Sequence, residues 1–375
     1  LIAVVVERIQ QGTSLKDLVA AAALANARTF GGEDYVGFHT MMALAPALHM
    51  TNELPADRQA LPVLKVLFRN TNRIQEFGGP SKEVLHQVAP AAGRHDGATL
   101  RQAVRAKDLN QAEKVFAAIA GEGPDNAFNQ LLFAVQDNTE VHRTVLPYRS
   151  WDLLGLIGDQ QAATLLRQSV HYCVKSERDW KHTEEHDRPR VLLPRLMDQY
   201  KLEAGVSSPT RAADDAWVDR MSRTIFEGSP DQAAEAVAAA LAEGFDAKAI
   251  GEALSLAANQ LVLRDAGRSQ REVQPGKPLG SVHGDSIGVH ACDSANAWRN
   301  MARVSNPRNT VACLILGAFQ VALDRVNRGG DFLSWTAHPR TEDFQLVRAK
   351  EVEPLLRELD ECVRANEQFR AAAVT

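Results

Sequence analysis

The chain has 375 residues, of which 45% are hydrophobic and 24% are charged, and its formal net charge is -5. This length and apolar content suffice for one large or two medium domains. The sequence has no long basic run, so we expect no nucleic acid among its partners. No apolar run reaches the roughly 18 residues that cross a bilayer, so we expect no membrane association.

The cysteines bear on the cellular compartment. Cys173, Cys292, Cys313 and Cys362 are scattered along the chain without CxxC spacing. A disulfide framework or a cysteine-rich zinc site is therefore not expected, which fits a reducing compartment and predicts a cytoplasmic location. The sequence begins at Leu1 and not at Met, which leaves a removed N-terminal signal segment open.

Helical spacing of apolar residues dominates the pattern from the N-terminus onward, and alanine, the best helix former, is abundant. No run of alternating apolar and polar residues indicates a strand. The sequence therefore predicts an all-α fold, either an irregular helical bundle or a helical-repeat array. The clearest helices are expected at residues 14–29, 111–120, 126–137, 160–175, 232–244 and 247–265.

Two later segments complete the predicted fold. The apolar run 309–326 is interrupted by Gln320 and Asp324, so it predicts a core helix. Residues 342–373 predict a long amphipathic helical region that is broken near Pro354. We expect residues 1–375 to form a single all-α domain.

An internal repeat is suggested by three segments of similar order, at residues 1–75, 110–175 and 230–325. Each begins with a helix, a glycine-containing turn and a second helix. Each continues with a histidine that opens a further apolar helix, and one more helix follows. Because the connecting loops differ in length, the pattern predicts a degenerate triplication and not a regular solenoid.

The histidines that open these helices are His39, His142 and His290. If approximate symmetry relates the three units, these side chains occupy equivalent places and can converge on one point. Imidazole is the commonest ligand of first-row metals, and three imidazoles with an open position make a catalytic site. We therefore predict a metal centre in which the three histidines are ligands.

Further candidate ligands lie close to these histidines in the sequence. Asp293 follows His290 by three residues, so the two side chains share a helix face and could bind one metal. His283 lies in the long loop 266–284, and His171 lies on the helix that follows the second histidine helix. Both are predicted as additional ligands or as groups that orient the ligands.

Other histidine and cysteine patterns predict no site. His182 and His186 have metal-like spacing in HTEEH, but neither glutamate stands where the HExxH motif needs its base. Their highly charged flanks predict a solvated surface helix. Cys292 lies between His290 and Asp293, and a regular helix would turn it away from His290, which predicts a buried and inert thiol.

The segments 38-FHTMMALAPAL-48, 141-VHRTVLPYRSWDLL-154 and 290-HACD-293 resemble the histidine helices of the questin oxidase family, a group of all-helical oxygenases. In that family, inward histidines on successive helices hold a non-haem iron, and one member's site uses four histidines and a carbamylated lysine. The later motif of the family is His-x-x-Lys at the head of a helix. The resemblance implies that Asp293 takes the place of this lysine. The chain departs from the family pattern at Leu146, where a further histidine would stand.

Together these features predict a metal-dependent oxidoreductase or oxygenase that acts on a small organic substrate. Imidazoles beside a carboxylate suit iron, manganese or zinc, and the resemblance favours iron. The resemblance also implies an aromatic substrate. Tyr148, Trp151 and Trp298 are the predicted pocket-lining residues. The sequence assigns no catalytic residue beyond the metal ligands and predicts no oligomeric state.

Two other functions stay open on the sequence alone. A helical-repeat binding scaffold without chemistry would place the same histidines in its core or its groove. A haem protein would use two of them as axial ligands, and the absence of CxxCH makes such a haem non-covalent.

Overall fold

The computed structural model of the chain describes residues 2–179, 184–205, 209–281, 286–327 and 331–375. Within these ranges the regular structure is helical and no strand is present, so the predicted all-α fold is confirmed. The α-helices are α1 (Ile2–Gln10), α2 (Leu15–Phe30), α3 (Tyr35–Met50), α4 (Leu61–Phe77), α5 (Gly97–Arg105), α6 (Leu109–Ala120), α7 (Pro124–Val135), α8 (Val141–Ile157), α9 (Ala162–Asp179), α10 (Glu184–Asp187), α11 (Pro189–Gln199), α12 (Asp215–Glu227), α13 (Pro230–Ala242), α14 (Ala247–Arg264), α15 (Ile287–Val304), α16 (Pro307–Asn327), α17 (Val352–Ala365) and α18 (Gln368–Val374). Short 3-10 helices span Thr51–Glu53, Pro80–Lys82, Asp159–Gln161, Gln270–Glu272 and Thr341–Leu346.

Serine and aspartate side chains fix where many of these helices begin. Ser14 accepts a hydrogen bond from the backbone N–H of Asp17 at the start of α2, and Asp34 accepts one from Gly37 at the start of α3. Such caps satisfy N–H groups that have no partner within the first turn. Where a cap and the apolar spacing agree, as for the predicted helix 14–29, the observed helix begins within a residue of the expected position.

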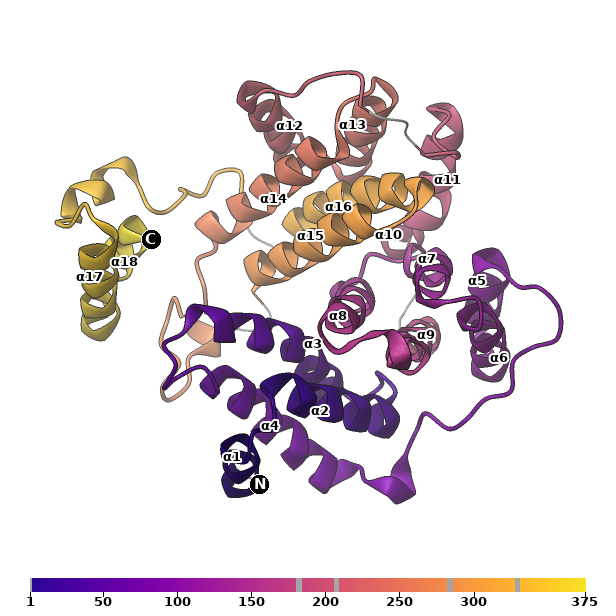
Figure 1. Cartoon of the computed structure of the whole chain (residues 1–375). Coiled ribbons are helices and arrows are strands. Elements are labelled where there is room, and N and C mark those ends of the chain that lie inside the picture. Colours follow the sequence, from indigo (N-terminus) through magenta and orange to yellow (C-terminus); the bar gives the residue numbers. More distant parts are fainter. Residues whose placement is uncertain (1, 180–183, 206–208, 282–285, 328–330) are drawn as a thin grey trace.

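Helix α8 lies at the centre of the molecule and packs against α3, α9 and α15 (Figure 1). The N-terminal helices α1 to α4 lie on one side of it, and α12 to α16 lie on the other (Figure 1). One continuous core of buried residues extends from Val5 to Phe332. The helices that carry the three predicted metal-ligating histidines, α3, α8 and α15, are therefore neighbours although they are far apart in sequence.

The C-terminal helices α17 and α18 stand beside this body (Figure 1). They pack on each other, and Arg370 of α18 donates a hydrogen bond of 2.6 Å to the carboxylate of Glu358 on α17. The predicted single helical region 342–373 is divided into a 3-10 helix and these two α-helices. Pro354 does not break a helix but lies in the first turn of α17, where a missing N–H leaves no hydrogen bond unmade.

Helix α16 contains the apolar run that predicted a core helix. By length and composition its segment Pro307–Val326 could cross a membrane, and it is the one described helix with this property. Inside the structure, 72% of its most apolar window is buried. Within this helix Gln320 is buried and accepts a hydrogen bond of 2.7 Å from the indole of Trp298, which explains why a polar residue is tolerated there.

A buried polar cluster joins α2, α3 and α4 beneath the first histidine helix. The side-chain amide of Asn26 donates to the carbonyl of Gly37 at 2.8 Å and to Oδ1 of Asn70 at 2.6 Å. The hydroxyl of Thr40 donates to the same Asn70 oxygen at 3.1 Å. These bonds fix the position of α3 relative to α2 and α4, and thereby the place of His39.

Replacement of Asn70 by alanine is expected to destabilise the protein by about 1–3 kcal/mol, because it removes the buried oxygen that accepts hydrogen bonds from Asn26 and Thr40. Asn72→Ala, on the same helix at a partly exposed position, is the matched control and should change stability by less than about 0.5 kcal/mol. Denaturant unfolding of both variants provides the comparison. Equal losses would contradict a role for the cluster in holding α3.

Candidate functional site

The structure brings the three predicted histidines together where α3, α15 and α8 meet. The Nε2 atoms of His39 and His142 are 3.2 Å apart, and the centroids of the two rings are 4.8 Å apart. The ring of His290 follows at 6.1 Å from that of His142. Residues separated by more than 250 positions in the chain thus contribute to one cluster.

The ring of His39 is fixed by its own helix. Its Nδ1 lies 2.7 Å from the carbonyl oxygen of Tyr35, and a carbonyl can only accept, so Nδ1 carries the proton. The rings of Tyr35 and Phe38 pack on either side, with centroids 4.4 Å and 4.8 Å away. Burial lowers the pKa of His39, and the nearby His142 lowers it further, so the neutral ring is favoured with its lone pair on Nε2.

The ring of His142 is fixed by a buried carboxylate. Glu140 caps α8, accepting hydrogen bonds from the backbone N–H groups of His142 and Arg143, and its Oε1 lies 2.5 Å from Nδ1 of the His142 ring. Tyr172 donates to the other carboxylate oxygen at 2.8 Å. Burial alone would raise the pKa of Glu140, but these bonds hold it below its ordinary value. The ionised carboxylate therefore keeps the proton of His142 on Nδ1.

The geometry of this histidine pair requires a cation. Because Nδ1 of each ring faces an oxygen acceptor, the two Nε2 atoms face each other at 3.2 Å, and their lone pairs repel unless a proton or a metal ion lies between them. At metal–nitrogen distances of about 2.0–2.1 Å, two ligand nitrogens lie about 2.9 Å apart at a right angle and about 3.4 Å apart at the tetrahedral angle. The observed separation falls between these values, so the pair fits two ligands of one metal.

Asp293 lines the same recess as His39, beside the histidine cluster. It extends from α15 into this recess, where it is still reached by solvent. The loss of part of its hydration raises the pKa of Asp293, while the positive charge of Arg149 opposes the rise. His39 and His142 also lower the pKa of Asp293, as Arg149 does. These groups are therefore close enough to interact electrostatically.

Across the part of the chain that the structure describes, no group of three or more histidine, cysteine, aspartate or glutamate side chains is close enough to hold a metal ion. His39 and His142 are positioned to give a metal ion two ligand nitrogens, whereas the ring of His290 lies farther away. A third bond would require His290 or Asp293 to move toward the pair.

The recess beside the pair has a volume of about 780 Å³. Helices α3 and α4 supply most of its wall, and α8 and α15 supply the rest. Its lining is largely apolar, with a few charged groups, which is the usual character of a small-molecule site.

His171 requires a correction, because the structure places it outside the histidine cluster. Its side chain is 2% exposed, with Nδ1 2.8 Å from Glu33 and Nε2 2.7 Å from Glu113. Both ring nitrogens are engaged by carboxylates, so neither is left for a metal. Burial alone would lower the pKa of His171, but the two carboxylates outweigh it and hold the pKa above its ordinary value.

The predicted pocket-lining aromatics also require correction. Trp298 is fully buried and its indole is bonded to Gln320, and the ring of Trp151 stacks on Phe128 at 4.6 Å. Tyr148 is buried as well. All three pack in the core, and the recess beside His39 is lined by aliphatic side chains instead. Large aromatic side chains contribute much of the buried area of a protein core, and these three do so here.

Two sequence features fall wholly or partly outside the described residues. His283 lies outside them, as does His182, and nothing is described of the side chain of His186. Glu184 and Glu185 of this motif begin α10 and are exposed, as predicted for a surface helix.

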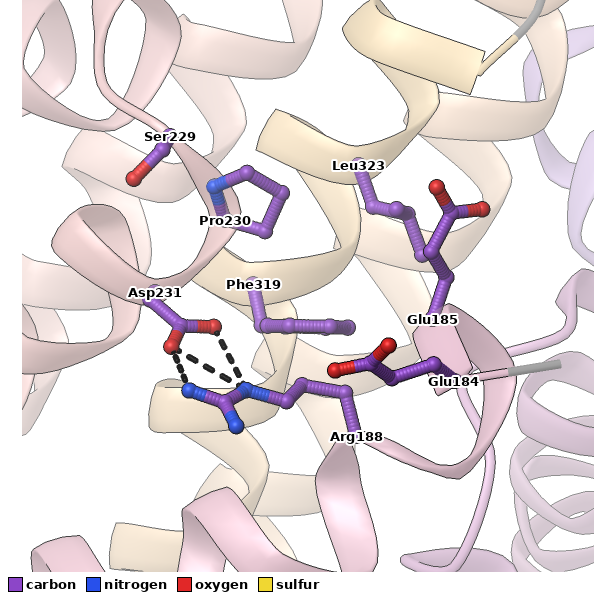
Figure 2. A pocket seen from close by; sticks show the side chains of 8 residues that line it. All are labelled: Glu184, Glu185, Arg188, Ser229, Pro230, Asp231, Phe319 and Leu323. Atoms are coloured by element: carbon purple, nitrogen blue, oxygen red, sulfur yellow. Dashed lines mark hydrogen bonds and ion pairs between the residues drawn. The ribbon is translucent and has the colours of Figure 1, made fainter.

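Figure 2 shows that these two glutamates line a separate recess of about 560 Å³. In it Arg188 donates to both carboxylate oxygens of Asp231, at 3.1 Å each from Nε, and Phe319 forms the floor between them and Leu323 (Figure 2). The ion pair joins the beginning of α11 to the beginning of α13, which is a structural role.

The thiol of Cys292 is partly buried and lies 3.4 Å from Oδ1 of Asn259. Burial, together with the negative charge of Asp293, raises the pKa of Cys292 to about 11. The thiolate is therefore scarce at neutral pH, and Cys292 is not an activated nucleophile.

Glu140, Tyr172 and Arg149 are the residues of the site that sequence reasoning missed. The position of Glu140 directly before an expected helix was the one available signal, since a carboxylate at that place caps the helix and can reach a histidine two residues later. The contact of Tyr172 with Glu140 depends on the packing of α9 against α8, which no local pattern contains.

Comparisons with protein-family models, with curated proteins and with solved structures find no match to this chain. The resemblance to the questin oxidase family stays a prediction.

The environment of His171 predicts a specific pH dependence of stability. Its pKa is raised in the folded state, so its contribution is complete below the ordinary value of 6.5 and is lost as the pH rises through the folded pKa. His171→Gln should therefore lower the free energy of unfolding by roughly 1.5–3 kcal/mol near pH 6, and the difference from the native protein should shrink toward pH 9.

Denaturant titrations at several pH values measure this difference. His95→Gln is the matched control and should show no such trend, because the His95 ring makes an exposed hydrogen bond of 3.0 Å with the backbone carbonyl of Ala92. If His171→Gln lowers the free energy of unfolding by the same amount near pH 6 and near pH 9, the result would contradict a charged His171 ring between two carboxylates.

Proposed function

We propose that this chain is a metal-dependent oxidoreductase that binds its metal through Nε2 of His39 and Nε2 of His142. The observation that carries the proposal is the 3.2 Å separation of two Nε2 atoms whose Nδ1 protons are both committed to oxygen acceptors. A carboxylate behind a metal-binding histidine is the usual means of fixing its tautomer and raising its basicity. Glu140 has this position behind His142.

His290 and Asp293 are the proposed further ligands. They lie three residues apart on α15 and next to the pair, one offering an imidazole and the other a carboxylate oxygen. Such a set of nitrogen and hard oxygen ligands suits iron, manganese or zinc. Iron is favoured by the resemblance of the three helices to those of the questin oxidase family.

The residues around the pair have separable roles in this proposal. Glu140 and Tyr172 orient the ring of His142, and the carbonyl of Tyr35 orients the ring of His39. The recess holds a small organic substrate next to these groups. A bound iron would supply the activation of dioxygen as oxidant. The oxidised substrate is a small organic compound, and the same resemblance points to an aromatic one.

A binding scaffold without metal is the second candidate, and a specific observation favours it. The same two Nε2 atoms are close enough to share a proton, so that one ring is an imidazolium that donates to the other. In that case the pair is a polar contact between α3 and α8. A haem with His39 and His142 as axial ligands fits less well, because the rings are too close to admit a macrocycle between their nitrogens.

Cobalt(II) titration of the metal-free protein separates these readings, because cobalt bound by histidine and carboxylate gives visible absorption bands. The native protein is expected to bind cobalt and to unfold at a higher temperature with it. His142→Ala should weaken cobalt binding by about tenfold or more, because it removes one of the two fixed nitrogens.

The matched control for this titration is His49→Ala. His49 lies on the same helix as His39, but its side chain is 51% exposed and its contact with Asp152 is 3.5 Å long. This variant should bind cobalt as the native protein does. Native affinity in His142→Ala would remove the histidine pair from any metal site, and an equal loss in His49→Ala would show nonspecific surface binding.

A further inference from the structure

The recess beside His39 joins an apolar wall to a set of cationic side chains. The wall comes from α3, from the connection to α4 and from the start of α4, through Met42, Pro46, Met50, Leu54 and Leu61. Methionine and leucine side chains adapt their shape to a ligand and offer it no hydrogen bonds. A ligand that fills this part of the recess must therefore present an apolar body.

Arg149 is the cationic residue of this lining that comes from the same helix as His142. It follows His142 on α8 by about two helical turns, so both side chains emerge on the same face of that helix. The Arg149 side chain is 18% exposed and lines the recess. Its closest bond to a carboxylate among the described residues is to Asp152, at 3.5 Å, which is the limit of a hydrogen bond. The guanidinium thus keeps donor capacity for a ligand.

The charge of the lining favours an anion. Arg58 and Lys65 lie on the outer part of the wall and are exposed, and they add two positive charges to that of Arg149. Asp293 is the carboxylate of the described lining, and Asp57 reaches Arg58 only at 4.0 Å and is itself exposed. A positive field over a partly enclosed apolar surface attracts negatively charged ligands and repels amines.

The shape of the cationic group selects among anions. A guanidinium offers two parallel N–H donors that match the two oxygens of a carboxylate. Arg58 and Lys65 are exposed on the outer wall, so Arg149 is the partly buried cation of the described lining. One such guanidinium beside an apolar surface suits one carboxylate better than a multiply charged phosphate, which usually needs several donors or a helix N-terminus. The geometry of the recess therefore matches a molecule with one carboxylate and an apolar body.

We propose that the substrate is a small apolar carboxylic acid whose carboxylate binds Arg149 and whose body lies along the wall formed by Met42, Pro46 and Leu61. The assignment of this ligand as a substrate rests on the proposed function. Arg58 and Lys65 draw the acid toward the opening, and Arg149 sets its orientation. The part of the body next to the carboxylate then lies beside His39 and Asp293.

The test compares naphthoate with naphthamide, which share a shape and differ in charge, by titration calorimetry of the full chain freed of metal with a chelator. The native protein is expected to bind naphthoate about tenfold more tightly than naphthamide. Arg149→Gln should abolish this preference and leave the binding of naphthamide unchanged. Arg149→Lys, which keeps the charge but not the paired donors, should keep part of the preference.

Arg223→Gln is the control, because Arg223 lies on α12 and pairs with Asp219 at the surface. It should bind both ligands as the native protein does. Equal affinity of the native protein for the two ligands would overturn the proposal, as would a preference that survives in Arg149→Gln. The absence of metal keeps this result distinct from the metal centre: a carboxylate preference that depends on Arg149 stands even if cobalt does not bind, and its failure leaves the cobalt titration intact.

Discussion

The contact between Nε2 of His39 and Nε2 of His142 is the feature on which the account of this protein depends. Two imidazoles do not ordinarily meet with both lone pairs forward, because neutral rings in that arrangement repel. The arrangement persists here because each ring is fixed from behind, one by the carbonyl of Tyr35 and the other by Glu140. The pair is therefore prepared for a cation, whether a proton or a metal ion.

The fold supplies this preparation through the beginnings of two helices. Helix α3 starts at Asp34, which is held by two hydrogen bonds from Arg73 of α4, at 2.8 Å and 2.6 Å. Helix α8 starts at Glu140, whose buried carboxylate both caps the helix and orients His142. Glu140 thus caps the helix and also orients the His142 ring. Because the helix cap already fixes the carboxylate, little further conformational entropy is lost in orienting the ring.

The sequence predicted the all-α fold and most helix positions because apolar spacing and capping residues agree along most of the chain. The grouping of His39, His142 and His290 could also be expected, because each opens a helix in one of three similar segments. The rest depends on contacts between distant elements. His171 looked like a fourth ligand until the packing of α9 brought it between Glu33 and Glu113, which lie 138 and 58 residues away.

The same limit applies to the recess. Trp298 looked like a pocket residue, but its environment is set by Gln320 on α16, with which it shares a hydrogen bond inside the core. Arg149 carries no sequence signal, since an arginine on an amphipathic helix is usually a solvated side chain. Its place in the recess follows only from the approach of α3 and α15 to α8.

Elemental analysis of the purified full chain by mass spectrometry tests the central claim most directly. The account predicts about one equivalent of iron, manganese or zinc per chain, with iron the expected element. A protein that is folded but free of metal, and that gains none on reconstitution, would contradict the metal centre and leave the histidine pair as a proton-sharing contact in a helical scaffold.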